Sequence, residues 1–219
     1  MKPDYEAAAA KACETLVKYR VSYAPVSPFP ILKSMPGVIV LSFAEMAKTI
    51  GVDRSCVMNN LITQNHDATT VISLNGGRIH YCVAYNQQLP VAFIQRSLAR
   101  ELGHIVLGHD GTRPEYVRNE EAVVFARHLL CPRPLIKSIQ DAGVTLTAEL
   151  FGTTTGCYDR CISCLHDTPG AHVPPELNRL VRSQFEDYVK NLLDYRSAVQ
   201  NEDITAPVDF GTYMDNYEE

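Results

Sequence analysis

The residues whose types and spacing point most directly to chemistry lie in the stretch 98–109. Read as a helix, this stretch has an apolar stripe that anchors it to a core. Arg100, Glu101 and His104 lie on another face. This is the spacing of H-E-x-x-H, in which two histidines bind zinc and the glutamate acts on a metal-bound water. Because Arg100 stands in the first histidine position, the motif keeps one candidate ligand and one candidate general base.

A second stretch, residues 119–132, offers a carboxylate for the same site. A catalytic zinc takes three protein ligands and keeps one position open for water. The apolar pattern predicts a helix here that carries two acids, Glu120 and Glu121. This helix could therefore supply a carboxylate ligand beside His104, with Glu120 as a weaker candidate.

Together, the two stretches resemble the ImmA/IrrE family of zinc metallopeptidases. The family pattern is an H-E-L-G-H helix followed by a helix of the form E-A-N-x-F-A-x-x-L-L-M-P. This chain reads Arg-Glu-Leu-Gly-His at 100–104 and Glu-Ala-Val-Val-Phe-Ala-Arg-His-Leu-Leu-Cys-Pro at 121–132. The resemblance extends more weakly over residues 25–165, and it departs from the pattern at Arg100 and Val123.

The resemblance implies a role for each matching residue. Glu101 would be the general base, His104 and Glu121 would bind zinc, and water would attack a peptide bond. The implied substrate or partner is a protein regulator, such as a helix-turn-helix repressor of the same phage or mobile element.

Arg100 changes this expectation. A guanidinium has no lone pair for a metal, stays protonated and repels a nearby dication. It can pair with Glu101 and Glu121, whose carboxylates would be costly to bury without a counter-charge once the metal is lost. We therefore predict a metal-free pseudoenzyme in which Arg100 replaces the charge of zinc. The alternative is an active zinc peptidase that uses a substitute ligand.

The other histidines are weaker ligand candidates. His109 lies about 140° around an ideal helix from His104, and we expect a polar residue at the helix end. His128 lies two turns along the second site helix, and we expect it at the surface or behind the ligands. Spacing supports neither His66 nor His80.

Cys157, Cys161 and Cys164 have the C-x3-C-x2-C spacing of an iron–sulfur loop. With His166 they would also permit a structural zinc site. The same spacing places the three thiols on one face of a helix, where free cysteines behave as small apolar residues. We expect buried helical cysteines here.

Residues 43–62 resemble a helix-turn-helix, with Ala47, Gly51 and Val57 at the turn-defining positions. The second helix carries almost no positive charge, and DNA affinity depends heavily on phosphate neutralisation. A DNA-binding regulator is therefore a further alternative, and a helical pair packed in the core is favoured over it.

The composition fits a globular protein of the cytoplasm. The 219 residues are 46% hydrophobic and carry a net charge of −5, which disfavours strong binding to nucleic acid or to a membrane surface. No run of eighteen apolar residues and no signal-peptide pattern occurs. The seven cysteines are odd in number and scattered, as is typical of a reducing compartment.

The elements that position the site follow from periodicity and from turn residues. We predict an α+β fold, in which a small twisted sheet with a β-hairpin packs on the site helices and the C-terminal part is helical. Ser42 and Glu45 form a capping-box pattern, and Asn75-Gly76 predicts the hairpin turn. We expect helices at 4–20, 42–51, 55–62, 91–107, 119–130, 134–142 and 156–165, strands at 38–41, 69–74 and 78–85, and one long helix from Pro174.

These elements suggest four parts of the chain. They are an N-terminal helix (1–24), a metallopeptidase-like domain (25–150), a helical extension (151–200) and an acidic, mobile tail (201–219).

Overall fold

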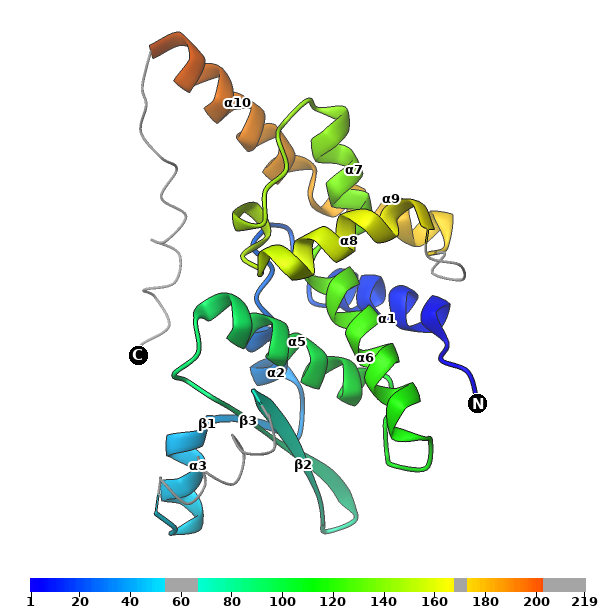
Figure 1. Cartoon of the computed structure of the whole chain (residues 1–219), viewed down its shortest axis with the longest axis vertical. Coiled ribbons are helices and arrows are strands. Elements are labelled where there is room, and N and C mark those ends of the chain that lie inside the picture. The colour runs from blue at the N-terminus through cyan, green and yellow to red at the C-terminus, as the bar shows by residue number, and fades with distance from the viewer. Residues whose placement is uncertain (54–66, 168–172, 203–219) are drawn as a thin grey trace.

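The structure is a computed structural model, and it describes residues 1–53, 67–167 and 173–202. Its architecture is α+β, as predicted, with a small mixed sheet and a predominance of helix (Figure 1). The elements are α1 (Tyr5–Lys18), α2 (Pro28–Ser34), β1 (Val38–Ser42), α3 (Phe43–Ile50), β2 (Ala68–Asn75), β3 (Arg78–Tyr85), α5 (Val91–Val106), α6 (Glu115–Leu130), α7 (Arg133–Asp141), a 3-10 turn (Glu149–Phe151), α8 (Thr155–Asp167), α9 (Pro175–Gln184) and α10 (Glu186–Glu202).

The sheet has the strand order β1-β3-β2, with β1 parallel and β2 antiparallel to β3. The predicted hairpin is present, but its turn is centred one residue later than Asn75-Gly76. Asn75 pairs with Arg78, and the two residues between them, Gly76 and Gly77, have φ of 56° and 75°. A two-residue turn of this kind needs left-handed backbone at both positions, which glycine adopts without steric cost.

Three helices form the centre of the molecule. Helix α6 packs against both α5 and α1, between the sheet and the helices α7 to α10 (Figure 1). The close contact of α5 with α6 depends on Gly103, where an added Cβ would lie 3.0 Å from Cδ1 of Phe125 and 3.3 Å from Cα of Ala122. This packing brings the 98–109 and 119–132 stretches together, as the site requires.

Two helix boundaries differ from the prediction. Helix α6 begins at Glu115, one turn before residue 119, because Pro114 occupies its N-cap position and fixes a favourable entry. The single long helix predicted from Pro174 is wrong, since the chain turns at Phe185 between α9 and α10. The Phe185 side chain at this turn is fully buried in the core.

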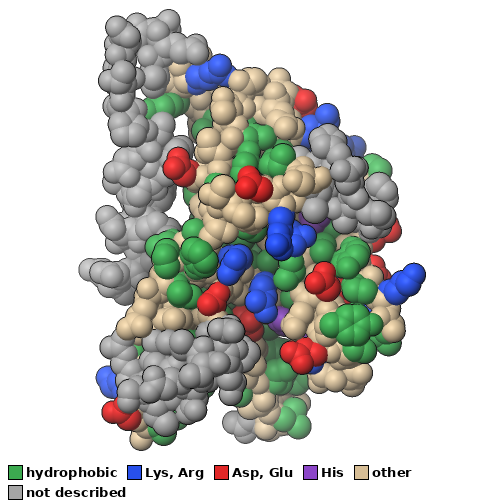
Figure 2. Space-filling model, viewed as in Figure 1, with side chains coloured by type: hydrophobic (Ala, Val, Ile, Leu, Met, Phe, Trp, Pro, Cys, Tyr) green, Lys and Arg blue, Asp and Glu red, His purple; other side chains and the backbone are tan. Residues whose placement is uncertain are grey.

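Parts of the predicted architecture lie outside the described residues. These are the helix at 55–62, and with it the second half of the helix-turn-helix pattern, and the tail from residue 203. Within the described ranges, none of the helices combines the length and the apolar run that crossing a bilayer requires. The mixture of charged side chains on the surface is visible in Figure 2.

The predicted capping box at the start of α3 is confirmed. The Ser42 hydroxyl accepts a hydrogen bond from Glu45 N at 3.2 Å, and Ser42 N donates to the Glu45 carboxylate at 2.6 Å. Replacing Ser42 by alanine should lower the free energy of unfolding by about 1 kcal/mol. Chemical denaturation measures this loss. A change below about 0.3 kcal/mol would show that tertiary contacts alone hold α3.

Candidate functional site

The predicted general base lies where the sheet meets α5. Glu101 is 7% exposed, and its Oε2 accepts a hydrogen bond from the Thr70 hydroxyl of β2 at 2.6 Å. A carboxylate this deep in the fold must keep hydrogen-bond partners, because burial without them is costly. The Thr70 contact therefore fixes the Glu101 side chain against the sheet.

The predicted metal ligand Glu121 is 1% exposed and accepts hydrogen bonds on both oxygens. Arg113 donates to it through two nitrogens, Nη1 to Oε2 and Nη2 to Oε1, each at 2.7 Å. Asp4 N donates to Oε1 at 2.7 Å, and His109 Nε2 lies 3.1 Å from Oε2. Bidentate pairing with a guanidinium is the strongest form of such a contact, and here it saturates the carboxylate.

His104 and His109 continue this network from α5. Their Nδ1 atoms lie 2.9 Å apart. Since the carboxylate of Glu121 can only accept, His109 must donate from Nε2. A neutral His109 then accepts at Nδ1 from the Nδ1–H of His104, an assignment that rests on the hydrogen-bond pattern. The His104 Nε2 atom remains an acceptor.

Both rings are held in the neutral form. Burial, together with the nearby His109 and Arg100, lowers the pKa of His104 to about 4. Burial also lowers the pKa of His109, although Glu121 opposes this shift. Two neutral imidazoles can share one hydrogen bond, whereas two imidazolium rings at this distance would repel each other.

The contact predicted between Arg100 and Glu121 is made by a different arginine. The guanidinium that pairs with Glu121 belongs to Arg113, in the loop before α6. Arg100 Nε is buried without a hydrogen-bond partner in the described part of the chain, and its charge acts on His104. The cation on Glu121 therefore comes from the loop between α5 and α6 and not from α5.

The structure also places the weaker ligand candidates. His109, expected at a helix end, is buried between His104 and Glu121. His128, expected at the surface or behind the ligands, is buried at 7% exposure, whereas Glu120 is exposed. A left-handed Gly108 (φ 67°) ends α5 and turns the chain back, which is why His109 does not follow ideal helix geometry.

Three residues of the site were not predicted from the sequence: Thr70, Arg113 and Asp4. Only Arg113 had a local signal, since it lies two helical turns before Glu121 and next to the helix-starting Pro114. Asp4 contacts Glu121 across 117 residues of sequence and Thr70 contacts Glu101 across 31, and no pattern in the sequence reports such pairs.

The donor set in this arrangement does not fit a catalytic zinc. Position 100 offers no lone pair, and both oxygens of Glu121 are occupied by Arg113. Among the side chains that the structure describes, no three from His, Cys, Asp or Glu gather in a way that could hold a metal ion.

Two of the predicted helical cysteines can be placed. Cys161 on α8 is 6% exposed, with its Sγ 4.0 Å from the carbonyl oxygen of Arg127, and Cys157 is half-buried. A hydrogen bond with Cys161 raises the pKa of the Cys157 thiol, one with Cys131 raises that of Cys161, and burial adds to both shifts, so both thiols stay neutral and unreactive. The side chains of Cys164 and His166 lie outside what the structure describes.

Comparisons with known proteins do not extend this picture. No protein-family model, curated protein or solved structure matches the chain.

Acidification should destabilise the fold through its buried histidines. Burial, with the charges of Arg133 and Arg127, lowers the pKa of His128 from 6.5 to about 3. Below pH 6.5 the unfolded chain therefore binds protons that the folded chain does not, so stability present above pH 6.5 is lost as the pH falls. Each such proton contributes a slope of about 1.4 kcal/mol per pH unit.

Replacing His128 by leucine should reduce this slope between pH 6.5 and 5 by the contribution of one proton. Urea denaturation at a series of pH values measures the slope for both proteins. An unchanged slope in the leucine variant would contradict the neutral, buried state assigned to His128.

Proposed function

We propose that this chain is a metal-free pseudo-peptidase of the ImmA/IrrE type that binds a protein regulator without cutting it. The observation that carries the proposal is the bidentate contact of Arg113 with the buried Glu121. In this proposal, the guanidinium supplies the positive charge that zinc supplies in an active peptidase. The family assignment itself rests on the two sequence motifs.

The arrangement of the helices supports this proposal. Glu101 and His104 lie on α5 and Glu121 lies on the adjacent α6, while β2 contacts α5 through Thr70. The same elements, a hairpin, the motif helix and the glutamate helix, are those that the resemblance implies for the site.

Charge balance explains why such a site would keep a cation after losing its metal. A buried carboxylate left alone is destabilising by several kcal/mol unless it takes up a proton. Arg113, whose side chain is 34% exposed, neutralises Glu121, whose side chain is 2% exposed. The network then stabilises the fold, although it no longer activates water.

The hairpin offers a surface for a protein partner. Ile72 and Leu74 follow Thr70 at alternate positions of β2, so they lie on the same face as the contact with Glu101. They are 49% and 75% exposed, and Ile79, which pairs with Leu74, is 53% exposed. Contiguous exposed apolar residues beside a former active site favour binding of a polypeptide. The partner we propose is a regulator such as a helix-turn-helix repressor.

One observation favours a second candidate, an active zinc peptidase with His109 as the substitute ligand. His109 lies next to His104 and to Glu121, the two residues that the resemblance assigns to the metal. This candidate requires Arg113 to leave Glu121.

Zinc analysis separates the two candidates. Protein purified without chelator should contain far less than one zinc per chain. The double variant R100H/R113Q should bind zinc stoichiometrically, because it restores a ligand and frees Glu121. R100H alone should bind more weakly.

A third variant, R100H/R113Q/E121Q, controls for adventitious zinc and should lose the gained metal. Stoichiometric zinc in the unmodified protein that disappears in H109A would establish the second candidate instead. A metal-free double variant that remains folded would show that His104 and Glu121 are not a ligand pair.

A further inference from the structure

The outer edge of β2 has no strand beside it in the described part of the chain. Strand β2 lies at one side of the sheet and forms its ladder with β3 alone. In the described ranges, no backbone hydrogen bond joins a β2 residue to a segment other than β3. An edge of this kind presents N–H and C=O groups with which a further strand can pair.

Strand β2 lacks the features that usually protect an edge. Edge strands are commonly short, charged, interrupted by a proline or a bulge, or covered by another element. The eight residues of β2 include no charged residue and no proline. Their register with β3 runs without interruption, from Ala68 opposite Tyr85 to Asn75 opposite Arg78. The strand at the opposite edge, β1, has only five residues, so β2 offers the longer pairing surface.

The side chains of β2 are exposed on both faces of the sheet. Val71 is 46% exposed and lies in one row with Cys82 and Ile39 on one face. Ile72 and Leu74 are 49% and 75% exposed and lie on the other face. The hairpin projects from the helical part of the molecule (Figure 1). A strand added to this edge would therefore pair with backbone groups and also cover apolar side chains.

We propose that the edge of β2 pairs with β2 of a second copy of this chain. Antiparallel pairing about a two-fold axis perpendicular to the sheet would join the two sheets into one continuous sheet. The exposed Ile72 and Leu74 of both copies would then lie on the same face. Two strands of this length make about eight hydrogen bonds when paired, which is within the number found at ordinary protein interfaces. This proposal does not depend on the family assignment.

Charge favours a second copy as the occupant of this edge. The chain carries a net charge of −5, so two copies repel each other over much of their surfaces. Because β2 has no charged residue, an antiparallel pair of β2 strands places no like charges opposite each other. Both copies use the same edge, so the assembly closes as a dimer and does not extend into a filament.

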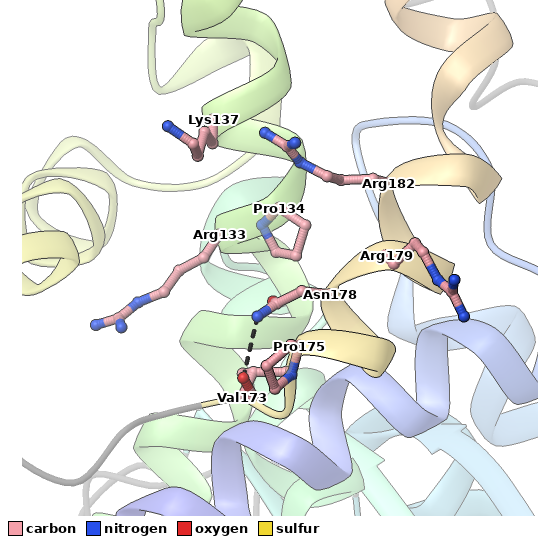
Figure 3. A pocket seen from close by; sticks show the side chains of 8 residues that line it. All are labelled: Arg133, Pro134, Lys137, Val173, Pro175, Asn178, Arg179 and Arg182. Atoms are coloured by element: carbon pink, nitrogen blue, oxygen red, sulfur yellow. Dashed lines mark hydrogen bonds between the residues drawn. The ribbon is translucent and has the colours of Figure 1, made fainter.

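The hollow between α7 and α9 is a weaker docking site (Figure 3). Of the cationic side chains along it, Lys137 and Arg182 pair with Asp141, at 3.8 and 3.1 Å. Arg179 pairs with Glu176 at 3.5 Å, and Figure 3 shows its side chain directed away from the space. These charges already have partners within the chain, whereas the outward backbone groups of β2 have none in the described ranges.

Sedimentation velocity at a series of protein concentrations tests the proposal. The unmodified chain should form a dimer whose fraction rises with concentration. V71K should raise the dimer Kd at least about tenfold, because Val71 lies near the middle of β2 and pairing brings the two introduced ammonium groups together. In the unmodified chain, hydrogen–deuterium exchange of the β2 amides should slow as the concentration rises, while that of β1 should stay the same.

The matched control is I39K. Ile39 is 56% exposed and lies in the same row and on the same face as Val71, but on β1 at the opposite edge. I39K adds the same charge and should leave the dimer Kd unchanged, and circular dichroism checks that both variants are folded. Equal weakening in both variants would overturn the proposal, because dimerisation would then depend on net charge or on the face of the sheet.

Two further results would also overturn it. One is a dimer that V71K leaves intact. The other is an unmodified chain that stays monomeric at about 100 μM, with exchange of the β2 amides independent of concentration. That result would leave the edge to a strand from a different protein.

Discussion

Replacing Arg113 by glutamine is expected to lower the free energy of unfolding by about 3 kcal/mol. The variant leaves Glu121 in a buried position with only Asp4 N and His109 as partners. Breaking a buried ion pair from one side is costly, because the remaining charge stays desolvated. Urea denaturation at neutral pH measures the loss.

The matched control for this variant is R179Q, which breaks an ion pair with Glu176 in which both side chains are 78% exposed. It should cost less than about 1 kcal/mol. The double variant R113Q/E121Q should recover part of the loss, since it removes both charges. A cost for R113Q no larger than that for R179Q would mean that the Arg113–Glu121 pair contributes little to stability.

Replacing Phe125 by alanine should cost about 4 kcal/mol. The Phe125 ring is fully buried on α6 and packs over Gly103 of α5, so its loss opens a cavity between the two helices that carry the site. Helix backbones in close contact cannot collapse easily onto such a cavity. Thermal and chemical denaturation both report the change.

Phe93 provides the matched control for the Phe125 variant. It lies on α5, is 38% exposed and contacts Arg96 through its ring. F93A should cost less than about 1.5 kcal/mol, because little of the ring is removed from water on folding. Similar losses in F93A and F125A would show that the α5–α6 contact does not limit the stability of the fold.

Features that depend on neighbouring residues could be predicted from the sequence. The capping box of Ser42 and Glu45, the hairpin strands and the bounds of α5 all follow local patterns, and the structure contains them. Such patterns act over one or two turns, where side chains and backbone constrain each other directly. The position of Glu121 beside α5 followed from two such helices.

The contacts that decide the chemistry of the site were less predictable. Arg113 and Arg100 have the same charge, and only the path of the α5–α6 loop determines which of them reaches Glu121. The position of His109 depends on the left-handed turn at Gly108, and that of Phe185 on the turn between α9 and α10. Tertiary geometry decides each of these, and local propensity does not specify it.

The first helix has a consequence for how the chain folds. Helix α1 is held at both ends by residues that come much later in the sequence. Asp4 N donates to the Glu121 carboxylate, and the Gln184 side chain donates to the Leu16 carbonyl oxygen across 168 residues. Closing such long loops slows folding, since the entropy of the intervening chain is lost before the contacts form. During synthesis, α1 emerges well before α6 and α9, so it must wait for most of the polypeptide before its buried face is covered.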